Sequence, residues 1–428
     1  MNRVIVILIA CFGVFLAGTV AAVALPFRHA GPWMAIRLVA TFVSFSFGIA
    51  WAVLSLFAIP RAIGRLVWLS HHPAGAGDRA IGVLALLLAL VPLLAVLVAT
   101  TVAWRVIGFR MPGRSYQGAL PPLTAVQQSL CADLRATIRT LARDIGDRNV
   151  SSRYTNLCAA ADFIQRSFES AGYEVHRQSY VPAASEAAGR ACFNLDAERP
   201  GAVRPEEIVI VGAHYDTVPG TGGANDNGSG VAATLALARA FAAERPARTV
   251  RFVAFANEEP PFFQTGDMGS LVYAKRCRER GEKVVAMLSL ETIGCYSDER
   301  ESQQYPLRLF TRFYPDTGNF IGFIGNPGSR RLAWDVAGSF RRHARFPSEA
   351  AVLPSIVSGV GWSDHWSFWQ AGYQAVMVTD TAPFRYLWYH TAQDSPDKLD
   401  YERMARVVAG LAAVVTDLAG SGSPPPGS

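Results

Sequence analysis

EIVIVGA, at residues 207–213, opens the stretch of sequence that decides the fold. This short run of apolar residues is typical of a buried β-strand. Residues 230–243 then have the periodicity and composition of a helix, and residues 249–256 (TVRFVAFA) again resemble a strand. The order strand, helix, strand predicts a mainly parallel sheet with helices on both of its faces.

The same alternation continues on both sides of this stretch. Further expected elements are a helix over residues 156–171, an extended segment over 173–180, a helix over 268–280, strands over 284–290 and 374–379, and a closing amphipathic helix over 401–418. Together these elements predict one large α/β domain. Sheets of this kind place their functional sites at the carboxyl ends of the strands.

The composition of the 428-residue chain points to membrane segments as well. Half of the residues are hydrophobic, 17% are charged and the mean hydropathy is +0.19, which excludes a disordered chain. Residues 1–115 contain nine Arg and one acidic residue, so they carry the basic excess and leave the remainder at −2. A basic charge confined to the hydrophobic part argues against nucleic-acid binding.

Three stretches without charged residues are long enough to cross a bilayer: residues 4–27, 38–60 and 80–104. Each has 23 to 25 residues, and a transmembrane helix needs about 20. The first stretch also fits a cleaved signal peptide, but its apolar region is long for one, so a retained anchor is favoured. We therefore expect a multi-pass integral membrane protein.

The arginines of the loops are divided almost evenly between the two sides of these spans, so the positive-inside rule does not decide the orientation. An odd number of spans after a short N-terminal tail favours an extracytoplasmic C-terminal domain. We expect a membrane domain over residues 1–114, a linker over 115–130, a folded domain over 131–420 and a flexible tail over 421–428.

Ionisable residues are dense where the expected strands end, and two more groups follow downstream. The strand ends and turns supply His214, Asp216, Asp226, Glu258, Glu259 and Glu291, and the downstream groups supply Asp364, His365 and His390. Because the carboxyl ends of parallel strands meet at one edge of a sheet, we expect these side chains to converge.

Histidines and carboxylates without thiolates suit zinc with an open catalytic position. We assign two zinc ions to five ligands: His214, Asp226, Glu259, Glu291 and His390. In this assignment Asp226 bridges the ions, and each ion also binds one histidine and one other carboxylate. The six cysteines of the chain include no CxxC pair and support neither a cysteine metal site nor a disulfide framework.

Two further residues complete the predicted chemistry. Asp216 lies two residues after His214 and faces the same way in an extended chain, so its carboxylate is placed to orient the imidazole. Glu258 faces the opposite way from Glu259 and is therefore the expected general base. It would take a proton from the attacking water and pass it to the leaving amine.

Each of these motifs has an ordinary structural explanation when it is taken alone. His-x-Asp occurs in many surface loops, a Glu pair is usually a solvated face, and Glu291 alone fits a structural ion pair. The Gly-rich run around Asp226 matches neither GxxxxGK[ST] nor GxGxxG, which argues against a nucleotide site. The ordered set, with each member at a strand end or a turn, is what indicates a metal centre.

The ordered motifs resemble those of metallopeptidase family 28. They read AHYDT, GANDNGSG, FANEEPPFF, LSLETIG, SDHWSFW and YHT, and the resemblance covers about residues 130–420. That family includes bacterial leucyl aminopeptidases, glutamate carboxypeptidases and glutaminyl cyclases. The resemblance implies a zinc peptidase domain built as a three-layer α/β/α sandwich with a mixed, mostly parallel sheet, here preceded by three transmembrane helices.

The resemblance also implies roles for the residues that match its motifs. The matching metal ligands are His214, Asp226, Glu259 and His390, the orienting residue is Asp216, and the base is Glu258. The SDH element implies that Asp364 and His365 line the site next to the ligands or the substrate. Glu291 departs from the pattern, because many members have Asp there, but its longer side chain can still reach a metal.

We therefore expect a membrane-anchored di-zinc metalloexopeptidase, specifically an aminopeptidase that hydrolyses N-terminal residues from peptides. Its expected partners are the peptide substrate and the lipid bilayer. One alternative is a glutaminyl cyclase-like acyltransferase, which uses one zinc ion and lacks a complete two-metal set. The other is an inactive binding or scaffold domain, which predicts lost ligands or a lost base. Aromatic-rich loops at residues 305–327 and 362–369 suggest an apolar substrate pocket.

Overall fold

A computed structural model describes residue 63 and residues 111–420 of the chain. The chain divides into two compact units, Met1–Val106 and Ile107–Ser428, and residues 111–420 belong to the second. Among the described residues, no helix is both long and apolar enough to span a bilayer. The predicted spans and the predicted tail lie outside the described residues, at positions 4–27, 38–60, 80–104 and 421–428.

The second unit is built around one eight-stranded sheet, in the order β1-β2-β4-β3-β5-β8-β6-β7. Its strands are β1 Val175–Tyr180, β2 Cys192–Arg199, β3 Arg204–His214, β4 Arg248–Phe255, β5 Lys283–Glu291, β6 Ile321–Gly325, β7 Ser348–Val352 and β8 Ala375–Thr379. The central strands β4, β3, β5 and β8 are parallel, as are β6 and β7. Strands β1, β2 and β6 each form antiparallel pairs, so the predicted mixed and mostly parallel sheet is confirmed.

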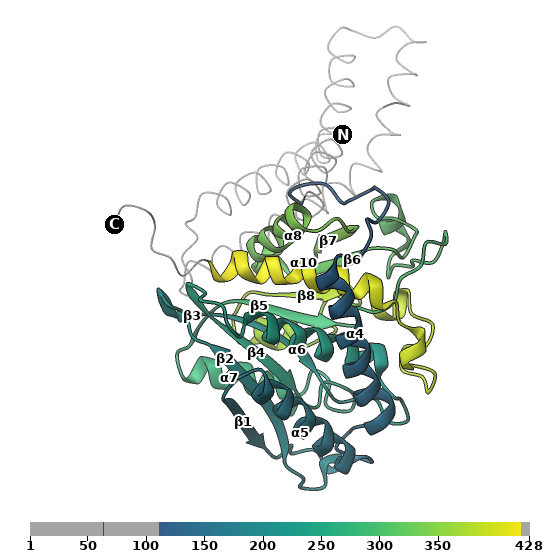
Figure 1. Cartoon of the computed structure of the whole chain (residues 1–428). Coiled ribbons are helices and arrows are strands. Elements are labelled where there is room, and N and C mark those ends of the chain that lie inside the picture. Colours follow the sequence, from purple (N-terminus) through teal and green to yellow (C-terminus); the bar gives the residue numbers. More distant parts are fainter. Residues whose placement is uncertain (1–62, 64–110, 421–428) are drawn as a thin grey trace, which may run out of the picture. The chain divides into compact units, whose positions relative to one another are not determined.

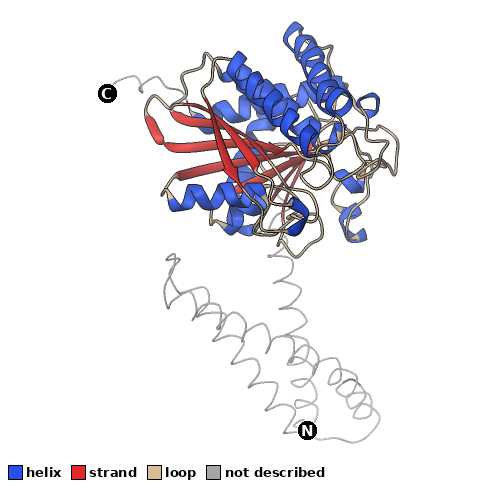
Figure 2. Ribbon diagram, turned by 90° about the horizontal axis from the view of Figure 1, so that it is seen from below, coloured by secondary structure: helices blue, strands red, loops and turns tan. Residues whose placement is uncertain are grey.

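Helices cover both faces of this sheet (Figure 2). On one face α6 packs on β3, β4 and β5, while α10 lies against α4, α6 and α8 (Figure 1). On the other face α7 contacts β2, and α9 contacts β5 and β8. The helices are α4 Ala125–Arg139, α5 Tyr154–Ser170, α6 Gly230–Phe241, α7 Gly269–Glu279, α8 Arg330–His343, α9 His365–Gln370 and α10 Tyr401–Ala419.

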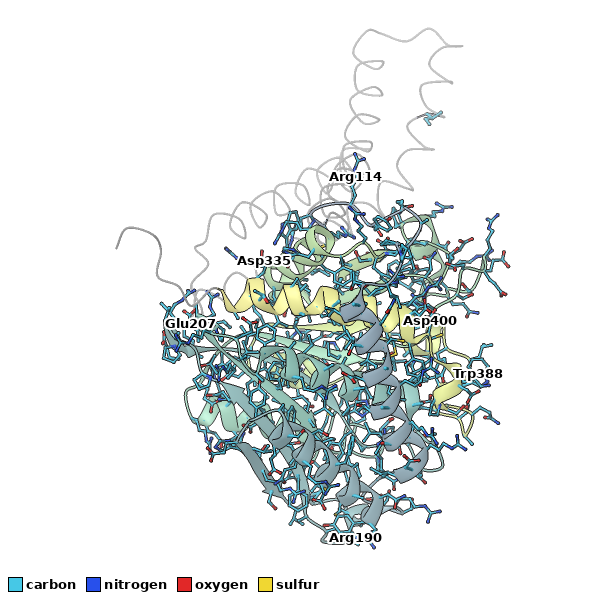
Figure 3. All side chains as sticks on the ribbon, in the orientation of Figure 1. Arg114, Arg190, Glu207, Asp335, Trp388 and Asp400 are labelled. Carbon is cyan, nitrogen blue, oxygen red and sulfur yellow. The ribbon has the colours of Figure 1, made fainter. Side chains whose placement is uncertain are left out.

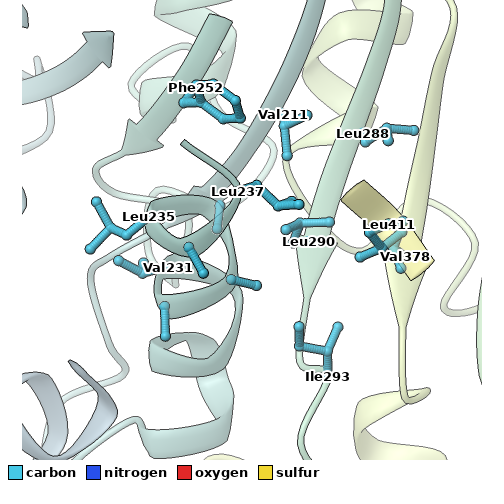
Figure 4. Close-up of a cluster of buried hydrophobic side chains, with 14 of the residues drawn as sticks. Val211, Val231, Leu235, Leu237, Phe252, Leu288, Leu290, Ile293, Val378 and Leu411 are labelled. Carbon is cyan, nitrogen blue, oxygen red and sulfur yellow. The ribbon is translucent and has the colours of Figure 1, made fainter. Parts of the chain in front are cut away.

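The alternation of side chains along β3 explains why its residues 208–213 are apolar throughout. Val211 belongs to the larger buried cluster under α6 and α10, where Figure 4 shows it near Leu237 and Leu288. Ile210 points to the other face and joins the smaller cluster with Tyr273 of α7. A strand buried on both faces needs apolar residues at every position, which is the pattern of EIVIVGA.

Within residues 111–420, every helix and strand expected from the sequence has a counterpart whose ends differ by no more than three residues. The predicted linker over residues 115–130 needs correction, because α4 begins at Ala125 inside it. Thr124 caps this helix: its hydroxyl accepts a hydrogen bond from the backbone N–H of Gln127, whose side chain in turn accepts one from the backbone N–H of Thr124. The buried Leu134 and Ile138 then tie α4 to the core, so the folded unit begins before residue 131.

A fully buried arginine fixes the loop that follows β3. The Nε of Arg148 donates a hydrogen bond to the carbonyl oxygen of Tyr215 at 2.6 Å, and its Nη1 and Nη2 donate to those of Gly222 and Gly223 at 2.6 and 3.0 Å. Burial lowers the pKa of Arg148 to about 10, so the group remains charged near neutral pH. These bonds satisfy the carbonyl oxygens of Tyr215 and Gly222, and they add to the bond that Gly223 accepts from the backbone N–H of Gly228.

Replacing Arg148 should therefore destabilise the unit strongly. The substitution Arg148→Met keeps an apolar stem but leaves several buried carbonyl oxygens without donors, which should cost about 3 kcal/mol or more in the free energy of unfolding. Thermal unfolding of the full chain, followed by circular dichroism, measures the effect. The exposed Arg166 of α5 offers the matched control, Arg166→Met. Equal melting temperatures for the two variants would contradict the assignment.

Candidate active site

The sheet brings several predicted residues to one edge. His214 is the last residue of β3, and Glu291 is the last residue of the neighbouring β5. On the other side of β3, Phe255 of β4 lies opposite His214, and Glu258 and Glu259 follow Phe255 in the next turn. The three strands are parallel, so their carboxyl ends deliver these residues to the same place.

Asp226 stands between two histidines. It lies in the turn Ala224–Ser229 that leads into α6. Its Oδ1 is 3.3 Å from Nε2 of His214, and its Oδ2 is 3.1 Å from Nε2 of His390. Each histidine also faces a glutamate: Nε2 of His214 lies 3.4 Å from Oε2 of Glu291, and Nε2 of His390 lies 3.2 Å from Oε2 of Glu259. The result is two His–Glu pairs that share one aspartate.

This cluster meets the chemical requirements of a metal centre. Ligand atoms of His214, Asp226 and Glu291 lie within 4.8 Å of one another, and so do those of Asp226, Glu259 and His390. Both ring nitrogens of His214, Oδ2 of Asp226 and Oε1 of Glu259 are buried without a hydrogen-bond partner among the described residues. Buried polar atoms are normally paired, so unpaired donors and acceptors that point at one another fit bound cations.

The charges of the cluster support the same interpretation. Asp226, Glu258, Glu259 and Glu291 are all buried, and within residues 111–420 no Lys or Arg forms an ion pair with any of them. Burial raises the pKa of Glu258 well above its usual range and raises that of Glu259 to about 8. Burial opposes the charge of Asp226 too, but the neighbouring imidazoles of His214 and His390 hold its pKa below the usual value. Divalent cations would compensate this concentration of negative charge.

Asp216 contacts the glutamate pair as well as the imidazole that the sequence predicted. Its Oδ1 lies 3.5 Å from Nδ1 of His214, as expected for an orienting carboxylate. Its two oxygens also accept hydrogen bonds from the backbone N–H groups of Glu258 and Glu259, at 3.0 and 3.1 Å. Asn257 just before them has a φ of +55°, a conformation that Asn adopts more readily than most residues. Asp216 therefore ties His214 and the glutamate pair into one unit.

Glu291 is held in place by a hydrogen bond from the SDH element. The hydroxyl of Ser363 donates to Oε2 of Glu291 at 2.7 Å, and Nδ2 of Asn227 lies 3.4 Å from the same oxygen. The longer side chain of glutamate thus still reaches His214. Glu291 therefore lies beside the other predicted ligands, although many members of the family have an aspartate at this position.

The other two residues of the SDH element differ in their surroundings. Asp364 is fully buried, and neither of its carboxylate oxygens has a hydrogen-bond partner among the described residues. The Nε2 of His365 lies 2.8 Å from the carbonyl oxygen of Val360, and its ring meets the ring of Trp369 edge-on at 4.5 Å. Burial lowers the pKa of His365 to about 4, so it is neutral near pH 7. Its contacts are those of a residue that shapes the wall of the site.

Asp394 is a supporting residue that the sequence analysis missed. Its carboxylate accepts hydrogen bonds from the backbone N–H groups of Asn225 and Asp226, at 2.8 and 3.1 Å, and from the hydroxyl of Tyr386 at 2.7 Å. It fixes the turn that carries the shared aspartate. Its position four residues after His390, in HTAQD, is the sequence feature that could have identified it.

A pocket adjoins the cluster and is bordered by Glu291 and Tyr389. The ring of Tyr389 stacks on that of His390, with their centroids 3.8 Å apart. Aromatic side chains line the pocket, among them Tyr305, Trp362 and Phe384. Two of these come from the aromatic-rich loops that suggested an apolar pocket.

Comparisons with known proteins agree with this site. The model of peptidase family M28 matches residues 194–415. The uncharacterized protein YfbL of Escherichia coli is 36% identical over 286 residues, which cover 65% of this chain and 85% of YfbL. Aminopeptidase YwaD of Bacillus subtilis is 28% identical over 215 residues, which cover 48% of this chain and 40% of YwaD.

Solved structures show the same fold. BSAP, a zinc aminopeptidase from Bacillus subtilis, aligns with a TM-score of 0.54 and 16% identity, covering 68% of this chain and 95% of its own. The glutaminyl cyclase of Bacteroides thetaiotaomicron aligns with a TM-score of 0.50 and 16% identity, covering 67% and 97%. At these identities the likeness extends to the fold alone.

The matched residues 194–415 include every predicted ligand and the predicted base. The predicted enzyme class, a zinc-dependent metallopeptidase, is confirmed at this level by the family model and by the zinc peptidases among the relatives. With more than half of its length matched by the family model, and with a relative such as YfbL, the chain belongs to peptidase family M28.

Proposed function

We propose that this chain is an aminopeptidase that uses two zinc ions. The observation that carries the proposal is the position of Asp226, whose two carboxylate oxygens each face a different His–Glu pair, at 3.3 and 3.1 Å from the histidine nitrogens. One ion would be held by His214, Glu291 and Asp226, and the other by His390, Glu259 and Asp226. Relatives that are named as aminopeptidases support cleavage at the N-terminal end of the peptide substrate.

The chemistry that we propose is hydrolysis of the first peptide bond. When bound, the ions supply Lewis acidity, which polarises a carbonyl group and lowers the pKa of water. Glu258 then acts as the base: it accepts a proton from the attacking water and returns it to the leaving amine. Its burial and its raised pKa suit a group that must hold that proton between the two steps.

Glu258 also has a competing role that the geometry leaves open. Its carboxylate, with His214 and Glu259, forms a third group whose ligand atoms lie within 4.8 Å of one another. In that arrangement Glu258 would be a ligand and the site would lack its base. We favour the base, because Asp226 and Glu291 already complete the set around His214.

A glutaminyl cyclase-like acyltransferase is the second candidate, since a cyclase shares the fold. That activity was expected to require one zinc ion and to lack a complete two-metal set. Here His214 faces both Asp226 and Glu291 at 3.3 and 3.4 Å, in addition to the set around His390. The presence of two complete sets of candidate ligands supports the peptidase.

We also propose that the N-terminal part anchors the enzyme in a membrane, with the catalytic unit on the extracytoplasmic side. The support comes from the sequence alone. Residues 4–27, 38–60 and 80–104 are uncharged and long enough to cross a bilayer. The hydrophobic part also carries the basic excess of the chain, as loops between membrane spans commonly do.

The variant Glu258→Gln tests the base. It removes the proton acceptor but keeps the shape of the side chain, so turnover of an aminoacyl amide should fall by a factor of about 10²–10⁴ while zinc content stays near that of the wild type. The comparison variant Glu259→Gln should lose zinc as well as activity. Elemental analysis and a fluorogenic substrate measure both. Loss of zinc from Glu258→Gln would show that Glu258 is a ligand.

Membrane anchoring predicts how the full chain behaves on extraction. After expression, alkaline carbonate should leave the chain in the membrane pellet, because only detergent releases protein held by spanning helices. A version that lacks residues 1–104 should move to the supernatant. A full chain that carbonate releases would contradict the anchor.

A further inference from the structure

The pocket beside the cluster has a floor formed by one end of the sheet. On strands β6 and β7, Phe323 and Ala350 belong to the core under α8. Their neighbours in sequence point to the opposite face, because side chains alternate along a strand. Gly322, Ile324 and Glu349 are such neighbours, and all three line the pocket. The rest of its lining comes from strands β5, β7 and β8, from loops, and from the short 3-10 helices Arg308–Arg312 and Ala382–Phe384.

The register of the sheet aligns the cluster with a second carboxylate. Glu291 of β5 pairs with Thr379 of β8, Thr379 pairs with Gly322 of β6, and Gly322 pairs with Glu349 of β7. Directly paired residues point to the same face of a sheet. The row therefore begins at a proposed metal ligand and ends at Glu349, three strand spacings or about 14 Å away.

One of the two middle positions of this row, Gly322, has no side chain to fill the space between the two ends. A Cβ atom at that position would lie 3.2 Å from the carbonyl oxygen of Thr379. In the next row, Met377 pairs with Ile324, and Ile324 pairs with Ala351. These residues give the path between the two ends an apolar side, and the aromatic rings of Tyr305 and Trp362 also line the pocket.

Glu349 is only partly matched by a positive charge. Its side chain is 20% exposed, and its Oε2 lies 3.8 Å from Nη2 of Arg341, beyond hydrogen-bond distance. Arg341 directs its hydrogen bonds elsewhere, to the hydroxyl and carbonyl oxygens of Ser348 and to the carbonyl oxygen of Pro112. Burial raises the pKa of Glu349 above its usual value, while Arg341 and Ser115 act in the opposite direction. A second cation would stabilise this carboxylate.

We propose that Glu349 determines substrate specificity, and that the pocket receives an N-terminal lysine or arginine whose charged end lies at Glu349. This inference rests on the proposed aminopeptidase function. The stem of such a side chain is apolar and suits Met377 and Ile324. Its cationic end meets aromatic rings and a carboxylate, which both attract positive charge. A short apolar side chain would leave the far end of the pocket empty.

A substrate panel on the full-length enzyme tests the inference. The probes are fluorogenic amides of Lys, Arg, Leu, Ala and norleucine, where norleucine supplies the apolar stem without the charge. The wild type should cleave the Lys amide with a kcat/KM about 10-fold or more above that of norleucine. Glu349→Gln should remove that advantage and leave norleucine and Leu within about 3-fold of the wild type. The control Glu206→Gln changes an exposed acid near the start of β3 and should alter neither.

Figure 3 shows that this control is remote from the site. Glu207, next to Glu206 in sequence, lies at the opposite end of the unit from Trp388, which belongs to the loop that carries His390.

The second variant, Gly322→Val, places a side chain across the path. It should reduce turnover of Lys, Arg and norleucine together and spare Ala.

Each outcome of the panel has a distinct meaning. If the wild type cleaves Leu and norleucine but shows no preference for Lys or Arg, the role of Glu349 is contradicted and the aminopeptidase function stands. The same holds if Glu349→Gln changes Lys and norleucine equally. A wild type that cleaves none of the amides contradicts the proposed function and this inference together.

Discussion

Four buried carboxylates share a small space at the edge of the sheet, and their mutual repulsion is the constraint on which the site depends. Asp226 lies between two histidines, and each histidine also faces a glutamate. Within residues 111–420 no Lys or Arg forms an ion pair with these four acids, and several polar atoms of the cluster have no hydrogen-bond partner. Such an arrangement favours the entry of positive charge, which links the geometry of the site to the proposed binding of metal ions.

The fold supplies this arrangement through a layered set of supports. Parallel strands β3, β4 and β5 deliver His214, the glutamate pair and Glu291 to one edge. Asp216 and Asp394 then hold the two turns by accepting hydrogen bonds from backbone N–H groups. Beneath them, Arg148 satisfies the carbonyls of the loop after β3. Asp394 supports its turn through backbone groups and Tyr386, whereas Asp216 also faces Nδ1 of His214 at 3.5 Å.

Much of this was predictable because the informative residues follow strong local patterns. The strand EIVIVGA is apolar on both faces, and the ionisable residues at its end and at the ends of its neighbours identify the cluster. Short strands were not predictable: β6 (IGFIG) and β7 (SEAAV) lack a clear alternation, and their pairing depends on contacts distant in sequence. For the same reason the sequence analysis did not single out Glu349, which the register places in a row with Glu291. Asp394 was missed because its role is to bind backbone groups, so its position four residues after His390 was the sequence signal for it.

The central claim is that two ions flank Asp226. The most direct test is a crystal structure of the zinc-loaded enzyme with anomalous diffraction collected at the zinc absorption edge. The account predicts two anomalous peaks, one contacted by His214 and Glu291, the other by His390 and Glu259, with one oxygen of Asp226 on each. A single peak in zinc-saturated crystals, or peaks that Asp226 does not contact, would contradict it.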